Sequence, residues 1–413
     1  MPADVFPVDW ATSNDIINLL GVGGGGCNAV NYMYKQGVEG CSFIVCNTDM
    51  QALRGCDVPE KIQLGHDGLG AGTDPIQGRN AALESQDEIA RKVLDTGTQM
   101  LFITAGMGGG TGTGAAPIIA KMAKDRGILT VGVVTIPFDN QGNETITRAI
   151  DGIHEMEKNV DSLLIIKNQN IITHFGDLLL HEAFPKSDEV LATAVKGIIE
   201  IIKKPGYINV DFRDVKVMMK DSGYALMGSG SGTGPTRIED AVREAFNSPL
   251  LNEYDLTSAR NILINVTAPR SEQGILGSQY QMISDEIRKY TGNTNSFKQG
   301  LIYEDDPAFG DKVTITAIVT GLQFVDIIGP AEDLGNYIFL DKDFVYMKED
   351  SQMGNNLQNA PLPIRSKIGF NSKENCRTFA FSPDQKPCLA VDPWEDKSFL
   401  ENEPAIRRAV KKD

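Results

Sequence analysis

The chain has 413 residues, 41% apolar and 23% charged, enough for about two or three domains with sizeable cores. No run of about 18 apolar residues occurs, which argues against a membrane-spanning helix, and the first residues lack the features of a signal peptide. The net charge of −16 disfavours non-specific binding to nucleic acid or to an anionic membrane. We therefore expect a cytoplasmic protein with no direct membrane insertion and no nucleic-acid partner.

The six cysteines contain no Cys-x-x-Cys pair, and the four histidines are scattered without the spacing of metal ligands. We expect free, buried thiols and no metal ion bound by protein side chains alone. The cysteines in question are Cys27, Cys41, Cys46, Cys56, Cys376 and Cys388.

In chain order, residues 1–14 are polar and aperiodic, which predicts a flexible N-terminal arm. The apolar run 16–20 predicts a strand that leads through Gly23–Gly26 into a helix, and Gly37 is a signal for the end of that helix. The first structured element is therefore expected to be a strand, a glycine-rich turn and a helix in succession.

Further runs are continuously apolar, which is typical of strands buried on both faces. They lie at 43–46, 100–104, 129–135 and 163–166. A helix is expected from Ala115 to Arg126, with Pro117 in its first turn, where the missing N–H does no harm. Alternating strands and helices predict an α/β fold with a Rossmann-like parallel sheet, which we assign to residues 15–187.

Residues 188–205 carry apolar side chains on two adjoining stripes, which predicts a long, buried central helix between two domains. A smaller α/β unit is expected over residues 206–325. Its expected elements are a helix at 237–247, a strand at 261–267, a helix at 279–290 and a strand at 313–320. Residues 326–397 are rich in polar residues, Pro and Gly and predict a flexible linker, followed by a short amphipathic segment at 398–413.

The strongest motif is the run Thr104–Gly114, which lies between a buried strand and a helix. Glycines let the backbone approach an anion closely, and a helix N-terminus offers free N–H groups and about half a positive charge. Thr111 and Thr113 carry hydroxyls that can donate to phosphate oxygens. The run predicts a phosphate-binding loop, but not a Walker A loop, because no Gly-Lys-Ser/Thr follows.

The earlier run Gly21–Gly26 is ambiguous, because it fits the Gly-x-Gly-x-x-Gly pattern of dinucleotide-binding folds, with Asp49 as the ribose-binding acid. A dinucleotide-dependent oxidoreductase therefore stays open as an alternative. Two phosphate loops on one sheet are better suited to a nucleoside triphosphate held from several strand ends. Gly70–Thr73 is a candidate for a third such loop.

Together these loops resemble those of the tubulin/FtsZ family of GTPases, over roughly residues 15–325. The resemblance implies a GTPase domain joined by a long central helix to a smaller activation domain. It also implies bound GTP or GDP, with Mg²⁺ held by phosphate and water. The residues implied to contact the nucleotide in these loops are Gly23, Gly24, Gly25, Asn28, Asn47, Ala71, Gly72, Thr73, Gly106, Gly108, Gly109, Gly110, Thr111, Gly112 and Thr113.

The same resemblance implies that Phe184 stacks on the guanine base and that Asn168 and Asp188 form hydrogen bonds with it. On the residue pattern alone, each of the three has a simpler interpretation. Phe184 fits a core position, Asn168 fits a turn, and Asp188 fits a helix cap.

The stretch Gly206–Asp214 resembles the family's loop that reaches into the nucleotide site of the next subunit. It implies that Asp211 and Asp214, with Asn209, position and polarise water beside the phosphates. A solvated acidic turn is the alternative for any isolated Asp-x-x-Asp. Phosphate loops and carboxylates at opposite ends would require subunits stacked head to tail, and such heterologous contacts build filaments.

Three positions depart from the family pattern. Gln141 stands where the family has an acid and Thr145 where it has an arginine, both near the ribose and phosphates, and Arg213 between the two carboxylates is unusual. We therefore expect weaker GTP binding and slower hydrolysis than the family norm. A GTP-binding polymer scaffold with little hydrolysis stays open as an alternative.

The segment 399–408 resembles the family's C-terminal peptide, which docks on membrane-tethering and regulatory division proteins. The match is carried by Pro404, Ala405, Ile406 and Arg407. As a whole, the resemblance implies GTP-dependent polymerisation into head-to-tail filaments of the bacterial division ring at mid-cell. It also implies that GTP is hydrolysed at the interface between subunits.

Overall fold

The computed structural model describes residues 16–169, 180–203, 206–208, 210–247, 256–292, 294, 296–322, 337–341 and 344–347. Its main strands are β1 (Ile17–Val22), β2 (Ser42–Asn47), β3 (Glu60–Gln63), β4 (Met100–Gly106), β5 (Leu129–Ile136), β6 (Ser162–Lys167), β7 (Gly223–Gly232), β8 (Asn261–Pro269), β9 (Ser296–Glu304) and β10 (Val313–Leu322). They form one ten-stranded sheet in the order β3-β2-β1-β4-β5-β6-β7-β10-β8-β9.

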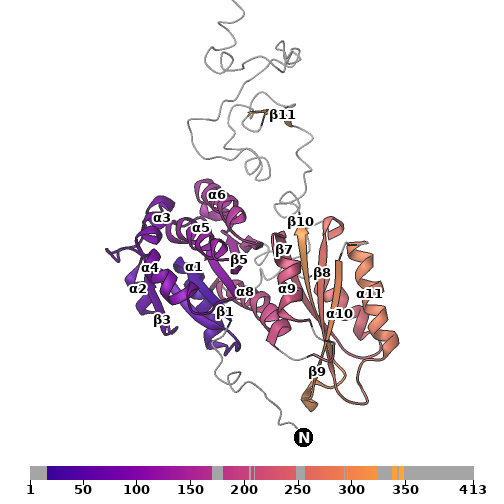
Figure 1. Ribbon diagram of the computed structural model, residues 1–413. Helices are drawn as coiled ribbons and strands as arrows, with labels where there is room; N and C mark the ends of the chain where they lie inside the picture. The colour runs from indigo at the N-terminus through magenta and orange to yellow at the C-terminus, as the bar shows by residue number, and fades with distance from the viewer. Residues whose placement is uncertain are drawn as a thin grey trace, which may run out of the picture.

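The helices cover this sheet in two groups, which Figure 1 shows as an indigo-to-purple half and a magenta-to-orange half. The first group is α1 (Gly23–Lys35), α2 (Met50–Arg54), α3 (Pro75–Glu84), α4 (Gln86–Ile89), α5 (Gly110–Asp125) and α6 (Asn143–Asn159). The second group is α9 (Phe212–Met219), α10 (Arg237–Phe246) and α11 (Gly277–Thr291), and α8 (Leu180–Lys203) lies between the two. Among the described residues, no helix is long and apolar enough to cross a membrane.

In the first half of the sheet, the strands β3, β2, β1, β4, β5 and β6 are all parallel to their neighbours, as the apolar runs predicted. Successive side chains of β1 enter two different cores. Leu20 and Val22 lie in the core under α5 and α6, whereas Ile17 and Leu19 lie in the core under α1 and α8. The prediction of a parallel sheet covered on both faces is therefore confirmed.

Helix α5 begins at Gly110, so the expected start at Ala115 was wrong, and Pro117 lies inside the helix rather than in its first turn. Glycine is a poor helix former, so the sequence analysis assigned the glycine-rich run before Ala115 to a loop. Packing explains the difference. A Cβ at Gly114 would lie 1.9 Å from the carbonyl oxygen of Pro75, so glycine is what lets α5 pack this closely against α3.

Helix α8 is buried along the residues that the sequence placed in its apolar stripes, including Val195 and Ile198. It begins at Leu180, eight residues before the expected boundary at 188. The expected start followed the apolar stripes, which begin at Val190, and the first turns of the helix lie before them. Asp188 consequently lies inside the helix, and the interpretation of it as a helix cap was wrong.

The second half contains elements that the sequence analysis missed, namely β7, β9 and α9. Strand β7 pairs in parallel with β6 and antiparallel with β10, so it joins the two halves into one sheet. Its glycines are unusual in a strand, so the sequence did not predict one there. A Cβ at Gly230 would lie 2.4 Å from the carbonyl oxygen of Ala241, and glycine therefore allows α10 to lie close to the strand.

Within the segment predicted as a flexible linker, β11 (Tyr337–Asp341) and β12 (Phe344–Met347) pair as an antiparallel two-stranded sheet. Part of the predicted flexible linker thus has regular backbone structure, and its flexibility stays a prediction. The other residues of 326–397 lie outside the described residues. The predicted arm at 1–14 and the predicted docking peptide at 398–413 also lie outside them.

Candidate functional site

The loops that follow β1, β2, β4 and β5 meet at one edge of the sheet, which we call the carboxyl edge, because these strands are parallel. A Cβ added at Gly23 would lie 2.8 Å from the backbone nitrogen of Gly112. A Cβ at Gly26 would lie 2.1 Å from the carbonyl oxygen of Thr104. The two glycine-rich runs therefore touch, and glycine is what permits the contact.

Two glycines at this edge are not explained by the protein's own packing. A Cβ at Gly24 or at Gly109 would meet no protein atom within 4 Å. Gly109 has φ −85°, a value that any residue adopts, so backbone conformation does not require glycine there. A ligand that approaches the backbone does require it, because a side chain would stand in its way.

Helices α1 and α5 point uncapped N-termini at this edge. Neither Val22 before α1 nor Gly109 before α5 accepts a hydrogen bond from the first turn through a side chain. The neighbouring helices α2 and α3 are capped by Asp49 and Asp74. The first turn of a helix leaves its backbone N–H groups without intrahelical partners, and an anion satisfies them well. The carboxyl edge thus has two N-termini suited to phosphate.

The threonines of the second run stabilise the loop itself. The Thr111 hydroxyl lies 2.6 Å from the Thr48 hydroxyl, and the Thr113 hydroxyl accepts a hydrogen bond of 2.9 Å from the Gly108 N–H. Both threonines are buried. Both hydroxyls thus have partners within the protein, and their donation to phosphate stays a prediction.

The remaining loop residues predicted to contact a nucleotide have different exposures. Asn28 and Thr73 are exposed, whereas Asn47 and Ala71 are buried. The Asn47 Oδ1 accepts a hydrogen bond of 3.2 Å from the Asp49 N–H. Asp49 itself caps α2, accepting hydrogen bonds from two backbone N–H groups. The dinucleotide alternative used this carboxylate for a ribose, and the cap gives it another role.

Arg148 on α6 is a basic residue of this site that the sequence analysis missed. Its Nε donates to the Gly108 carbonyl oxygen at 3.1 Å, and its Nη2 donates to the Thr145 Oγ1 at 3.2 Å. Its Nη1 lies 3.2 Å from Glu144 Oε1. The signal was a basic residue one helical turn after Thr145. Gln141 is exposed in a short 3-10 turn just before α6.

Two of the three predicted guanine contacts belong to described side chains. Asn168 follows β6 at the carboxyl edge and is half-buried. Asp188 is half-buried on α8, and burial raises the pKa of its carboxyl group to about 6. The side chain of Phe184 lies outside the described ones. The structure therefore leaves the stacking role untested.

The loop that leads into α9 carries the predicted carboxylates. Asp211 Oδ1 accepts a hydrogen bond of 2.8 Å from the Asp214 N–H, and Asp214 Oδ2 accepts one of 3.4 Å from the Asp211 N–H. The pair forms a capping box at the start of α9. The Lys298 ammonium, 2.8 Å from Asp214 Oδ1, lowers the pKa of that carboxyl group. Asn209 lies outside the described residues.

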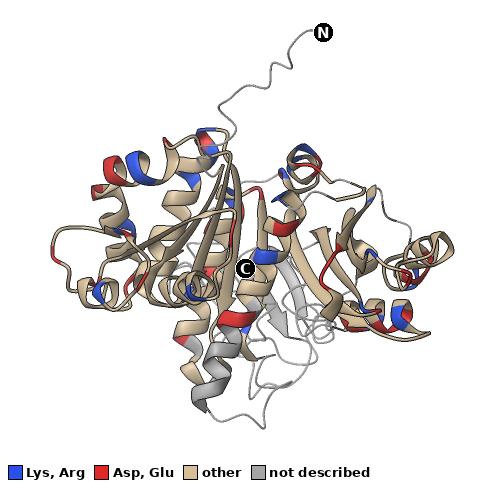
Figure 2. Cartoon of the chain, turned by 90° about the horizontal axis from the view of Figure 1, so that it is seen from below, with Lys and Arg blue, Asp and Glu red and all other residues tan. Residues whose placement is uncertain are grey.

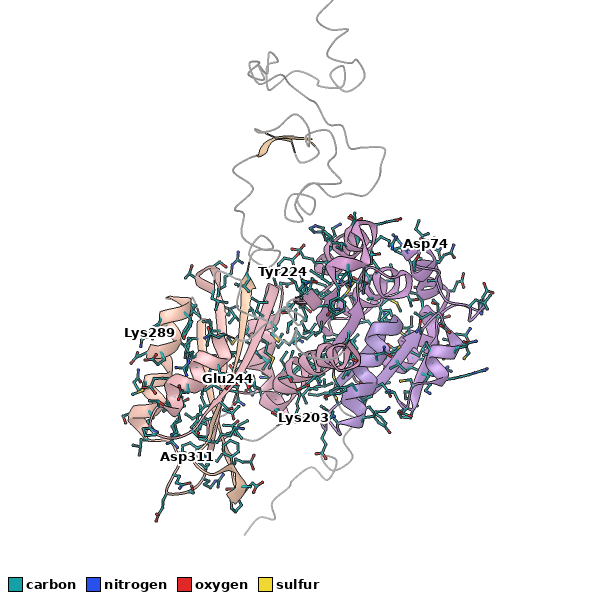
Figure 3. All side chains as sticks on the ribbon, turned by 180° about the vertical axis from the view of Figure 1, so that it is seen from behind. Asp74, Lys203, Tyr224, Glu244, Lys289 and Asp311 are labelled. Carbon is teal, nitrogen blue, oxygen red and sulfur yellow. The ribbon has the colours of Figure 1, made fainter. Side chains whose placement is uncertain are left out.

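This loop lies away from the glycine runs of its own chain. Lys203, the last residue of α8, lies against Gly40, just before β2 begins and therefore at the opposite, amino edge of the sheet. A strand the length of β4 separates the edges by about 23 Å. Figure 3 shows Lys203 far from Asp74, which lies beside the glycine runs. One chain therefore does not bring the two groups together.

Large apolar side chains are exposed near both groups. Leu69 is 89% exposed and Ile76 is 65% exposed, next to the loop 70–73. Tyr207 is 77% exposed and Val217 is 78% exposed, around the loop that leads into α9. Exposed apolar residues that gather around functional loops are typical of protein–protein contacts.

Comparisons with known proteins agree with this arrangement. Residues 16–176 match the family model "Tubulin/FtsZ family, GTPase domain", and residues 223–323 match "FtsZ family, C-terminal domain". The chain is 45% identical over 334 residues to the cell division protein FtsZ of Porphyromonas gingivalis, covering 78% of this chain and 71% of that protein. It is 47% identical over 320 residues to the Pseudomonas putida protein of the same name, covering 76% and 78%.

Among solved structures, the chain resembles an empty FtsZ dimer from M. jannaschii, with a TM-score of 0.68 and 35% identity over 76% of this chain and 90% of that one. It also resembles the GDP-bound monomer of CetZ1 from Haloferax volcanii, with a TM-score of 0.65 and 20% identity over 75% and 95%. At that identity, the second likeness supports the fold alone.

Proposed function

This chain belongs to the FtsZ branch of the tubulin/FtsZ family, and we propose that its GTP site is completed by the Asp211–Asp214 corner of a second subunit. It is a GTPase that polymerises into the division ring. No finding favours the oxidoreductase alternative. What we add concerns the residues that carry out the reaction and the way in which two copies share it.

The observation that carries the proposal is the separation of the two half-sites. The uncapped helices and open glycines lie at the carboxyl edge, and the loop with the carboxylates follows α8 from the amino edge. A second copy stacked with its amino edge on this carboxyl edge would bring Asp211 and Asp214 to the phosphates. The contact is heterologous, and repeating it gives a filament.

The surfaces support this stacking. The exposed Leu69 and Ile76 at one edge would face the exposed Tyr207 and Val217 of the next subunit, which would remove these side chains from water. Figure 2 shows acidic and basic residues interspersed over both halves of the face in view. The net charge of −16 still repels copies from one another, so the exposed apolar side chains would have to offset that repulsion.

The reaction would divide between the two subunits. The first turns of α1 and α5 would bind the phosphates through backbone N–H groups, with Gly24 and Gly109 leaving room for them. The neighbour's Asp211 and Asp214 would orient the attacking water and accept its proton. Mg²⁺ held by phosphate oxygens and water would neutralise negative charge during transfer.

At the base, we propose that Asp188 and Asn168 form hydrogen bonds with the guanine and that Phe184 stacks on it. The half-buried Asp188 supports this, because a desolvated carboxylate forms strong hydrogen bonds with N–H donors. At the ribose and phosphates we propose Gln141 and Thr145, with Arg148 as the cation that holds the Gly108 backbone.

We further propose that the protein acts in the cytoplasm at mid-cell. Residues 398–413 would dock on membrane-tethering and regulatory division proteins, at the end of a linker over 326–397, and residues 1–14 would form an N-terminal arm. The proposal rests on the resemblance of Pro404–Arg407 to the family's docking peptide.

The experiment that tests the shared site uses Asp214→Ala. The variant should bind GTP as an isolated subunit with wild-type affinity, because Asp214 lies away from the glycine runs of its own chain, and it should lose hydrolysis. Asp305→Ala, which removes another exposed carboxylate of the same half, is the matched control and should hydrolyse GTP normally. Hydrolysis by Asp214→Ala at the wild-type rate would show that the proposed site is wrong.

A further inference from the structure

The Asp214 carboxylate is bound to a strand as well as to its own helix. The Lys298 ammonium on β9 lies 2.8 Å from Asp214 Oδ1, and the other oxygen accepts the Asp211 N–H. The Lys298 side chain is 49% exposed and that of Asp214 is 28% exposed. Both carboxylate oxygens of Asp214 thus have a partner, one on the loop and one on β9.

The same strand also aligns the backbone of the loop. Leu301 accepts a hydrogen bond of 2.7 Å from the Tyr207 N–H and donates one of 3.1 Å to the Ile208 carbonyl oxygen. A Cβ at Gly300 would lie 2.9 Å from Val210 Cγ2, so glycine there lets the loop lie directly on the strand. β9 therefore contacts the loop on both sides of its turn into α9.

We propose that Lys298 is a positioning residue for Asp214, fixing its carboxylate to β9 in one orientation for the GTP of the next subunit. This inference rests on the proposed function of Asp214. Lys298 does not touch substrate in this account. It acts through the carboxylate, which would otherwise depend only on the first turn of α9 for its orientation.

The electrostatics agree with this role. In the described part of the chain, Lys298 on β9 acts on Asp214 through a hydrogen bond and its charge, and the Asp211 backbone N–H adds a second hydrogen bond. The Asp211 carboxylate acts on Lys298. The hydrogen bond and the positive charge of Lys298 lower the pKa of Asp214, and the same pair raises the pKa of Lys298. At neutral pH both side chains are therefore charged. Removing the ammonium should raise the pKa of Asp214.

Folding is not expected to depend on this pair. Ion pairs between exposed side chains contribute little to stability, because solvent screens them and ordering two long side chains costs entropy. Lys298 variants should therefore fold and bind GTP. A change in turnover can then be assigned to the position and charge of Asp214.

The test measures GTP hydrolysis by assembled protein at saturating GTP from pH 3 to 8, a range that reaches below the ordinary pKa of an aspartate, with GTP affinity of isolated subunits measured in parallel. Lys298→Gln should lower kcat by roughly tenfold, within the cost of misplacing a catalytic group. It should move the acidic limb of the profile to higher pH, because the ammonium no longer stabilises the ionised carboxylate of Asp214. Its GTP affinity should not change, and Lys298→Arg should restore most of the turnover.

The matched control is Lys289→Gln, which removes the ammonium of another exposed ion pair, with Glu286 on α11, and should behave as wild type. A Lys298→Gln protein with the wild-type kcat and pH profile would overturn the inference, provided that Asp214→Asn is inactive. An active Asp214→Asn protein would instead overturn the proposed function, and the inference with it. The two failures are therefore distinguishable.

Discussion

At the scale of single residues, the glycines of the carboxyl edge have different roles. Gly23 and Gly26 permit the two loops to touch, and Gly110 would place a Cβ 2.8 Å from that of Ala71. Only open positions such as Gly24 and Gly109 report on a ligand. The sequence predicts the motif, but it does not separate these roles, because the neighbours of each glycine come from other loops.

Gly109→Leu should fold normally and lose at least tenfold in GTP affinity, because the side chain would occupy the space that a phosphate needs. Gly277→Leu, at another open and exposed glycine that begins α11, is the control and should bind GTP as wild type does. Fluorescent-nucleotide titration measures both. Wild-type affinity in a folded Gly109→Leu protein would remove this loop from the site.

Arg148→Ala should weaken GTP binding at least tenfold, since it removes the charged donor that holds the Gly108 backbone, and one such hydrogen bond is worth about 1.5–3 kcal/mol. The GTP affinity of Arg148→Lys should lie between those of wild type and Arg148→Ala, because an ammonium cannot make the same paired contacts. Isothermal titration measures the loss. Equal affinity in all three proteins would mean that Arg148 does not hold the loop.

The raised pKa of Asp188 leads to a prediction of how GTP affinity depends on pH. Its pKa in the free protein is raised to about 6 by desolvation, and hydrogen bonds from a guanine would favour the ionised form. GTP affinity should therefore be constant above about pH 7 and fall as the pH drops below 6. In Asp188→Asn this fall should be smaller, and an unchanged fall would assign it to another group.

At the scale of elements, the buried strands and the apolar helix α8 could be predicted from the sequence, because their hydrophobic patterns are local and do not depend on neighbouring segments. The glycine-rich elements do not. The first turn of α5 and the end of β7 have poor intrinsic propensities, and packing against α3 and α10 overrides them. The departure at Thr145 was visible in the sequence, whereas the contact of Arg148 with Gly108 was not, because it joins residues 40 positions apart.

Gly230→Ala tests this account of β7. The new Cβ would lie 2.3 Å from the backbone nitrogen of Ala245, so α10 would have to move, at a cost of about 1–3 kcal/mol in unfolding free energy. Urea denaturation measures it. Ser231→Ala, one position along the strand, is the control with little expected effect. An unchanged midpoint for Gly230→Ala would show that the packing between α10 and β7 is loose.

At the scale of the whole molecule, α8 sets the distance between the two half-sites. Its end beside Gly40 directs the following loop to the amino edge, while the nucleotide loops lie at the carboxyl edge. Sequence motifs identified both halves, but their separation within one chain follows only from the direction of the strands. In the proposed mechanism, that separation makes assembly a condition for hydrolysis, because neither subunit alone would carry the complete site.

The most direct test mixes two inactive proteins. At a GTP concentration well below the weakened affinity of Gly109→Leu, that variant keeps the carboxylates but stays largely without GTP, whereas Asp214→Asn binds GTP but lacks a carboxylate. In an equal mixture, about a quarter of head-to-tail contacts would pair an intact phosphate site with an intact Asp214. We predict that the mixture hydrolyses GTP although neither protein does so alone. A mixture that stays inactive, while each variant folds and enters wild-type polymer, would contradict the shared site.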